Sequence, residues 1–139
     1  MKKREPVTHI MTKDVLTADI AKDDLHSVKD LIDKHKLRHV PITHNNKLVG
    51  IISKTDINRL TFSSLFEGQE QADEAVLDML KIEHVMSNNP KVIDTETTIR
   101  DVADIFANEE FHSLPVVEND SVVGIVTTTD VIRYMLDQY

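Results

Sequence analysis

The chain has 139 residues, of which 40% are hydrophobic and 29% charged, and it has no cysteine. These values are typical of one globular domain in the cytoplasm, and they exclude a disulfide framework, a thiolate zinc site and a cysteine nucleophile. The formal net charge of −8 argues against nucleic acid as a partner, and no apolar run reaches the ~18 residues of a membrane helix, so neither nucleic-acid nor membrane binding is predicted.

The chain is an internal repeat. The phrase "GIISKTD" at 50–56 returns as "GIVTTTD" at 124–130, and the same spacing relates Pro41 to Pro115. A fixed period over about 50 residues indicates a duplicated structural unit. We therefore expect repeat 1 at residues 1–60, an acidic connecting segment at 61–81 and repeat 2 at 82–139.

Repeat 1 is predicted to start with an extended segment at residues 15–18. Apolar residues at helical spacing follow from Leu25, with Asp23 as the expected N-cap. Two strands are predicted at 39–43 and 47–53, because the polar turn between them contains asparagines that tolerate a positive φ. A second helix is expected to begin near Asp56.

The connecting segment is acidic, and its favoured interpretation is a solvated linker with a packed end; partner binding is the alternative. Four apolar residues predict a helical turn or two in it: Ala75, Val76, Met79 and Leu80. Three apolar residues after repeat 1 favour core packing over a dimer contact: Phe62, Leu65 and Phe66.

Repeat 2 is predicted to have the same order of elements. An extended segment at 91–93 precedes a helix with Thr97 as its expected N-cap, and strands are predicted at 114–118 and 121–127. A second helix is expected near Asp130. Units of about 50 residues bury too little surface to stand alone, so we expect the repeats to pack face to face on one core. The predicted fold class is α/β (α+β), with two pseudo-symmetric β-α-β-β-α repeats in one module.

Each repeat places a hydroxyl at the end of a strand and a carboxylate three residues later, as Ser53–Asp56 and Thr127–Asp130. An ionised carboxylate can accept hydrogen bonds from the hydroxyls of a ribose. The Ser or Thr hydroxyl and the N–H groups of a helix N-terminus suit a phosphate. The spacing therefore favours a nucleotide ligand, and the alternative is that each pair merely caps the second helix.

No catalytic constellation is recognisable, so an enzyme is not predicted. The hydroxyl–aspartate pairs lack an adjacent general base, and the sequence contains no P-loop or nucleophile elbow. The histidines form no compact cluster, so no metal site is predicted. No cofactor is expected to be required, and magnesium is expected only as the companion of a bound nucleotide. The basic segment 34–39 either complements a helix end or binds phosphate.

Longer stretches of the repeats resemble a tandem pair of CBS (cystathionine β-synthase) domains of the stand-alone type. These are "HVPITHNNKLVGIISKTDINRL" and "SLPVVENDSVVGIVTTTDVIRYM", with the openings "VTHIM" and "IEHVM". The resemblance implies a regulatory module that binds an adenosine ligand (AMP, ADP, ATP or a related compound) in clefts between the repeats. It also implies an unknown regulated protein as partner and a homodimer. S-adenosylmethionine, NAD or a cyclic dinucleotide is an alternative ligand, and a ligand-free dimerisation module is the alternative function.

The resemblance also implies which residues line the clefts. The cleft around Asp56 is expected to contain Ser53, Asp56, Lys91, Val92, Phe111, His112 and Pro115. The cleft around Asp130 is expected to contain Leu16, Thr17, Leu37, Arg38, His39, Pro41, Thr127 and Asp130. Because arginine carries a fixed charge, we expect the Asp130 cleft to bind a phosphorylated adenosine more tightly. Apolar residues of the second helices are expected at the homodimer interface: Ile57, Leu60, Val131, Ile132 and Met135.

Overall fold

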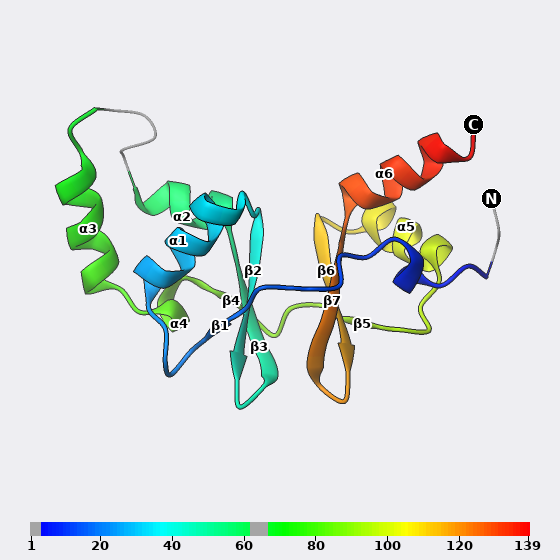
Figure 1. The fold of residues 1–139 in the computed structure, drawn as a ribbon, viewed down its shortest axis with the longest axis horizontal. Helices are drawn as coiled ribbons and strands as arrows, with labels where there is room; N and C mark the ends of the chain where they lie inside the picture. The colour runs from blue at the N-terminus through cyan, green and yellow to red at the C-terminus, as the bar shows by residue number, and fades with distance from the viewer. Residues whose placement is uncertain (1–3, 62–66) are drawn as a thin grey trace. The chain divides into compact units, whose positions relative to one another are not determined.

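The computed structural model describes residues 4–61 and 67–139, so that Phe62, Leu65 and Phe66 lie outside the described residues. The chain divides into two compact units. The first, Leu16–Pro90, is called the β1–β4 unit, and the second, which joins the segment up to Val15 to Lys91–Tyr139, is called the β5–β7 unit. Each unit combines a small mixed sheet with helices, which confirms the predicted α/β class (Figure 1).

The β1–β4 unit has a sheet of the order β1-β2-β3-β4, in which β1 is parallel to β2 and the other pairs are antiparallel. Its strands are β1 (Ala18–Asp19), β2 (His39–His44), β3 (Lys47–Ser53) and β4 (Ser87–Asn88). Its helices are α1 (Leu25–His35), α2 (Lys54–Leu60), α3 (Glu70–Met79) and α4 (Ile82–Val85).

The β5–β7 unit repeats this plan with a sheet of the order β5-β6-β7, in which β5 is parallel to β6 and β6 is antiparallel to β7. Its elements are the 3-10 helix η1 (Val7–His9), β5 (Ile93–Asp94), α5 (Ile99–Asn108), β6 (Ser113–Glu118), β7 (Ser121–Thr127) and α6 (Thr128–Asp137). Among the described helices of either unit, none has the length and apolar character that crossing a membrane requires.

Both hairpins turn on two residues with positive φ, as predicted. Asn45 and Asn46 have φ values of 52° and 64°, and Asn119 and Asp120 have values of 54° and 68°. Asparagine and aspartate enter this region more readily than other residues that carry a side chain, and consecutive positive φ values match the twist of the flanking strands. The local sequence therefore fixes where each hairpin folds back.

The first helix of each repeat is capped one residue later than predicted. Asp24, not Asp23, caps α1, and its carboxylate accepts a hydrogen bond from a backbone N–H of the first turn at 2.9 Å. This hydrogen bond lowers the pKa of Asp24, so the cap acts above that lowered pKa and is lost as the pH falls through it. Asp23 accepts instead from the N–H of Asp19 at 2.7 Å. Thr98, not Thr97, caps α5.

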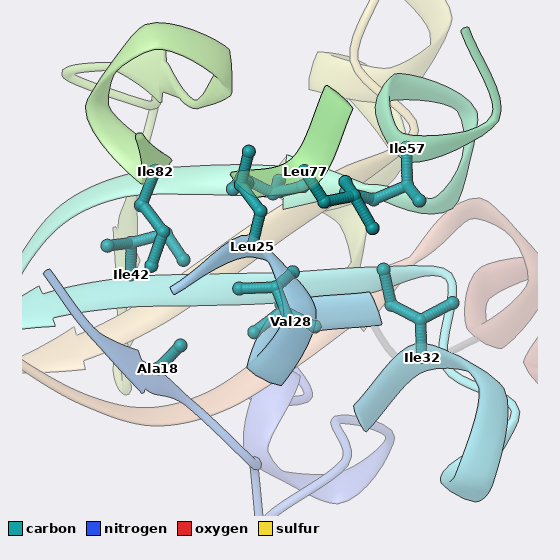
Figure 2. Close-up of a cluster of buried hydrophobic side chains, with 10 residues drawn as sticks. Ala18, Leu25, Val28, Ile32, Ile42, Ile57, Leu77 and Ile82 are labelled. Atoms are coloured by element: carbon teal, nitrogen blue, oxygen red, sulfur yellow. The ribbon is translucent and has the colours of Figure 1, made fainter. Parts of the chain in front are cut away.

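The core of the β1–β4 unit lies between its sheet and its helices. Buried side chains come from the inner face of α1, from the central strands and from the helices that follow them (Figure 2). The buried members are Ala18, Leu25, Val28, Ile32, Val40, Ile42, Ile52, Ile57, Leu77 and Ile82. The β5–β7 unit has a separate cluster of the same kind: Val7, Ile93, Val102, Leu114, Val116, Val126 and Val131.

The connecting segment forms a longer helix than predicted, because α3 has 10 residues where only a turn or two was expected. Leu77 of α3 is buried in the core beside Ile57 of α2, and Asp73 is buried as well. Nε2 of His26 on α1 lies 2.6 Å from Oδ1 of Asp78. α3 therefore packs against α1 and α2 and belongs to the β1–β4 unit.

The opening segment of each sequence repeat packs on the hairpin of the other repeat. Thr12 bridges Ile125 of β7, with backbone N···O distances of 2.9 and 3.0 Å. At the equivalent place in the β1–β4 unit, Ser87 of β4 pairs with Ile51 of β3. Each compact unit therefore combines the opening of one repeat with the hairpin of the other.

The packing of each opening segment on the hairpin of the other repeat explains the glycine in the repeated phrase. A Cβ atom at Gly50 would lie 2.9 Å from Cγ of Met86 and 2.9 Å from the carbonyl oxygen of Ser87, and one at Gly124 would lie 3.0 Å from Cγ of Met11. Glycine is the residue that lets another segment approach a strand this closely. The repeated methionines of "VTHIM" and "IEHVM" therefore pack directly on these glycines, and any side chain at the glycine positions would collide with them.

Candidate functional site at the hairpin ends

Each hydroxyl–aspartate pair lies where the second hairpin strand ends and the second helix begins. β3 ends at Ser53 and β7 ends at Thr127, and a helix starts at the next residue in both cases. Strand pairing places His39 opposite Ser53 and Ser113 opposite Thr127. The two candidate sites therefore occupy equivalent positions in the two compact units. Each lies at the open end of its hairpin, opposite the turn, and this place is called the hairpin end of the unit.

Both pairs form capping boxes. Oδ2 of Asp56 accepts a hydrogen bond from the N–H of Ser53 at 2.8 Å, and Oγ of Ser53 accepts one from the N–H of Asp56 at 3.0 Å. The corresponding distances between Asp130 and Thr127 are 2.8 and 3.3 Å. The capping geometry that the sequence offered as an alternative is thus present in both repeats.

The caps use one oxygen of each carboxylate. Oδ1 of Asp56 lies 3.8 Å from Nη1 of Arg59, and within the described part of the chain Oδ1 of Asp130 has no hydrogen-bond or ion-pair partner. Both aspartates are only half-buried. A carboxylate has about four lone-pair sites, so each aspartate can cap its helix and accept a hydroxyl of a ligand at the same time.

Basic residues gather at the hairpin end of the β1–β4 unit. The N–H of Lys54 donates to the carbonyl of Arg38 at 2.8 Å, which holds the loop before β2 against the start of α2. Arg38 and Lys54 are exposed, and neither forms an ion pair with a described residue. Helix α1 ends before this loop, and the ammonium group of Lys34 in its last turn complements the helix dipole. Arg38 and Lys54 are therefore available for a phosphate.

The hairpin end of the β5–β7 unit has the same backbone arrangement but a different charge. The N–H of Thr128 donates to the carbonyl of His112 at 3.1 Å. Nζ of Lys91 lies 3.4 Å from Oε2 of Glu109, so an acidic neighbour balances its charge. Val92 and Phe111 are 41% and 40% exposed and offer apolar surface to a ligand.

The predicted site residues are divided between the two compact units. Eight belong to the β1–β4 unit: Leu16, Thr17, Leu37, Arg38, His39, Pro41, Ser53 and Asp56. Seven belong to the β5–β7 unit: Lys91, Val92, Phe111, His112, Pro115, Thr127 and Asp130. Pro41 and Pro115 are buried within their strands, so they shape the site and do not offer surface. The division of these residues between two clefts stays a prediction.

Sequence reasoning missed Lys54 as a site residue. It is the first residue of α2 and lies directly after Ser53. The signal was present in the repeated phrase, because "SKTD" has a lysine where "TTTD" has a threonine. A comparison of the two copies position by position would have identified this difference in charge.

Two of the apolar residues expected at a homodimer interface are buried in their own units, and that part of the prediction is wrong. Ile57 of α2 and Val131 of α6 each belong to the core of the unit that contains them. They pack inward because each lies on the face of its helix that meets its own sheet. Ile132 and Met135 are exposed.

The family model described as "CBS domain" matches residues 7–62 and 82–137. The chain belongs to the CBS domain family. The resemblance noted in the sequence is thereby confirmed for both repeats, and the connecting helix α3 of this CBS pair lies between the two matched segments.

The CBS pair is similar to a protein of Methanocaldococcus jannaschii named MJ0188, with 33% identity over 138 residues, 95% of this chain and 44% of that protein. The chain spans less than half the length of the first curated relatives it matches.

The CBS domain pair of protein MJ0100, solved with 5′-methylthioadenosine and S-adenosyl-L-methionine, is 26% identical with a TM-score of 0.76, over 96% of this chain and 98% of that one. CBSX2 from Arabidopsis thaliana, solved with AMP, has 21% identity, a TM-score of 0.76 and the same coverage, a likeness of fold alone.

Proposed function

We propose that this CBS pair is a regulatory module that binds an adenosine-containing ligand at its hairpin ends. The observation that carries the proposal is the pair of equivalent capping boxes, in which each aspartate has an oxygen beyond the one that caps the helix. The 5′-methylthioadenosine and S-adenosyl-L-methionine bound in the structure of the CBS domain pair of MJ0100 support the same class of ligand. Asp56 and Asp130 would accept hydrogen bonds from ribose hydroxyls.

A phosphorylated adenosine such as AMP, ADP or ATP fits the surrounding charges best. Lys54 follows Ser53 directly, its N–H is bonded to the carbonyl of Arg38, and both basic side chains are exposed, so a phosphate bound here would gain from them and an uncharged or cationic sulfur compound would not. At the equivalent place in the β5–β7 unit, exposed apolar side chains such as Phe111 suit an adenine ring. Magnesium would accompany only the nucleotide, and no separate cofactor is proposed.

In this proposal the bound ligand changes the population of two states of the module, and a regulated protein responds to that change. A ligand-free dimerisation module is the second candidate function. The complete capping boxes favour it, because they account for both copies of the motif without any ligand. The proposal and this candidate differ in whether an adenosine compound stabilises the protein.

Thermal unfolding with a panel of compounds tests the proposal. The panel contains AMP, ADP, ATP, S-adenosylmethionine, NAD and cyclic dinucleotides, with GMP and inorganic phosphate as controls. A ligand at 100 times its dissociation constant should stabilise the protein by about 2.7 kcal/mol. We expect the largest increase in Tm with a phosphorylated adenosine and none with GMP or phosphate. No increase with any adenosine compound would contradict the proposal and favour the dimerisation module.

A further inference from the structure

Helix α3 is attached to the β1–β4 unit by little apolar surface. Among its described residues Leu77 is the one buried hydrophobic side chain. The other buried side chain is the carboxylate of Asp73, whose desolvation opposes docking even when the group has a partner. The pair formed by His26 and Asp78, at 2.6 Å, lies at the surface, where an ion pair adds little. The docking of α3 therefore depends mainly on Leu77.

The helix also has little stability of its own. Its N-cap, Gln69, makes no side-chain hydrogen bond to the first turn. Glu70, Glu74 and Asp78 are spaced four residues apart, and like charges at this spacing destabilise a helix that contains no basic residue. A helix of 10 residues is also too short to be stable in isolation. We therefore expect α3 to open locally at a lower cost in free energy than the unfolding of its unit.

Leu77 packs beside the residue that attaches α2 to the core. Helix α2 has seven residues, of which Ile57 is buried, and Leu77 lies next to Ile57 in the core cluster (Figure 2). A helix of two turns depends on such packing, because short helices are marginal in water. Ile57 directly follows Asp56, which forms the capping box at the hairpin end. The docked α3 therefore stabilises the turn of helix that carries the candidate ribose acceptor.

The corresponding helix of the other repeat is attached more firmly by its own unit. Helix α6 has 10 residues, and two of them, Val131 and Tyr134, are buried. The hydroxyl of Tyr134 also donates to Oε1 of Glu5 at 3.1 Å. Asp130 therefore lies on a helix that has two buried contacts where α2 has one.

We propose that α3 is a conformational switch for the ligand site at Asp56. The docked helix keeps α2 in the state that binds ligand, and a bound ligand favours the docked state in return. This coupling rests on the proposed function, because it requires an adenosine ligand at Asp56. It is reciprocal: the affinity at Asp56 differs between docked and undocked α3 by the factor by which the ligand shifts the docking equilibrium. Since α3 lies outside the two segments that match the family model, the switch belongs to the connecting segment and not to either repeat.

Hydrogen exchange followed by mass spectrometry tests the support of α2 by α3 without any ligand. Leu77→Ala should speed the exchange of amides in α3 at least about tenfold and should also speed that of α2. Amides of β2 and β3 report any general loss of stability, and the change in α2 should exceed theirs, while α6 keeps its wild-type rates. Met79→Ala is the matched control on the same helix, because Met79 is 80% exposed, and it should leave α2 unchanged.

Circular dichroism confirms that the Leu77→Ala variant is folded, and the milder Leu77→Val replaces it if it is not. A change in α2 no larger than that in β2 and β3 would overturn the proposal.

Calorimetric titration with AMP tests the coupling. In an Asp130→Asn background, which keeps the Asp56 site, adding Leu77→Ala should weaken AMP binding about fivefold or more. In an Asp56→Asn background, which keeps the Asp130 site, the same change should leave the affinity as it was. AMP should also slow the exchange of α3 in the first background and not in the second.

Equal effects of Leu77→Ala on AMP binding in the two backgrounds would overturn the switch. If AMP bound in neither background, the proposed function would be contradicted, and the coupling to AMP with it. The exchange of α2 in the ligand-free protein would then still decide whether α3 stabilises α2, so the two failures are distinguishable.

Discussion

Replacing Leu25 by alanine should lower the free energy of unfolding by about 3 to 5 kcal/mol. Leu25 is the first residue of α1 and is completely buried, with Val28, Leu77 and Ile82 in the same cluster (Figure 2). Truncation removes buried methyl groups and leaves a cavity that helix and sheet close only in part. This loss is a large share of the about 5 to 15 kcal/mol that a domain usually has.

The measurement is urea unfolding followed by circular dichroism at a helix wavelength. Met79→Ala is the matched control, because Met79 is 80% exposed at the end of α3, and its loss should stay within about 0.5 kcal/mol. A loss below about 1 kcal/mol for Leu25→Ala would contradict the close packing of this core.

Replacing Val7 by aspartate should unfold the β5–β7 unit, although Val7 opens the other sequence repeat. Val7 is completely buried in the cluster of that unit, and its N–H donates to the carbonyl of Thr97 at 2.8 Å. A carboxylate without a partner in such a place costs about 3 kcal/mol or more. The unit then loses the segment that bridges β7 and the start of α5.

Tyrosine fluorescence reports this change, because the chain has two tyrosines, no tryptophan, and both tyrosines lie in the β5–β7 unit. Tyr134 is buried, and its hydroxyl donates to Oε1 of Glu5 at 3.1 Å, so its emission follows the docking of the segment. Lys13→Asp places the same side chain at an exposed position of that segment and should have little effect. If the unfolding transitions followed by tyrosine fluorescence were the same for Val7→Asp and Lys13→Asp, the packing of the opening segment of repeat 1 within the β5–β7 unit would be contradicted.

Local chemistry made the hairpins and helices predictable. The turns follow from Asn45–Asn46 and Asn119–Asp120, whose positive φ values suit these residue types. The N-caps were misplaced by one residue because Asp23 and Asp24 are adjacent and both are good caps. The length of α3 was underestimated, because its face toward the core contains Asp73 beside Leu77 and weakens the apolar period.

Contacts between segments that are far apart in the chain could not be predicted from the sequence. The openings "VTHIM" and "IEHVM" have the same pattern, so either could pack on either hairpin, and only the structure shows that Met11 lies against Gly124 and Met86 against Gly50. The candidate site was predicted through its hydroxyl–aspartate spacing. The two hairpin ends differ in charge, because Lys54 and Arg38 are adjacent at one and Lys91 is paired with Glu109 at the other. This difference depends on how loops pack on helix ends, which a local sequence pattern does not predict.

The central claim is that the two repeated aspartates bind a ribose, and calorimetric titration with AMP tests it most directly. The variant to compare carries Asp56→Asn and Asp130→Asn, because asparagine keeps an oxygen for the capping box but loses the charge. We predict an affinity about 10- to 100-fold weaker than that of the wild type, equivalent to about 1.5 to 3 kcal/mol, with a nearly unchanged Tm. 2′-Deoxy-AMP should show a smaller difference between the two proteins. Equal affinity for AMP in the wild type and the variant would contradict the account.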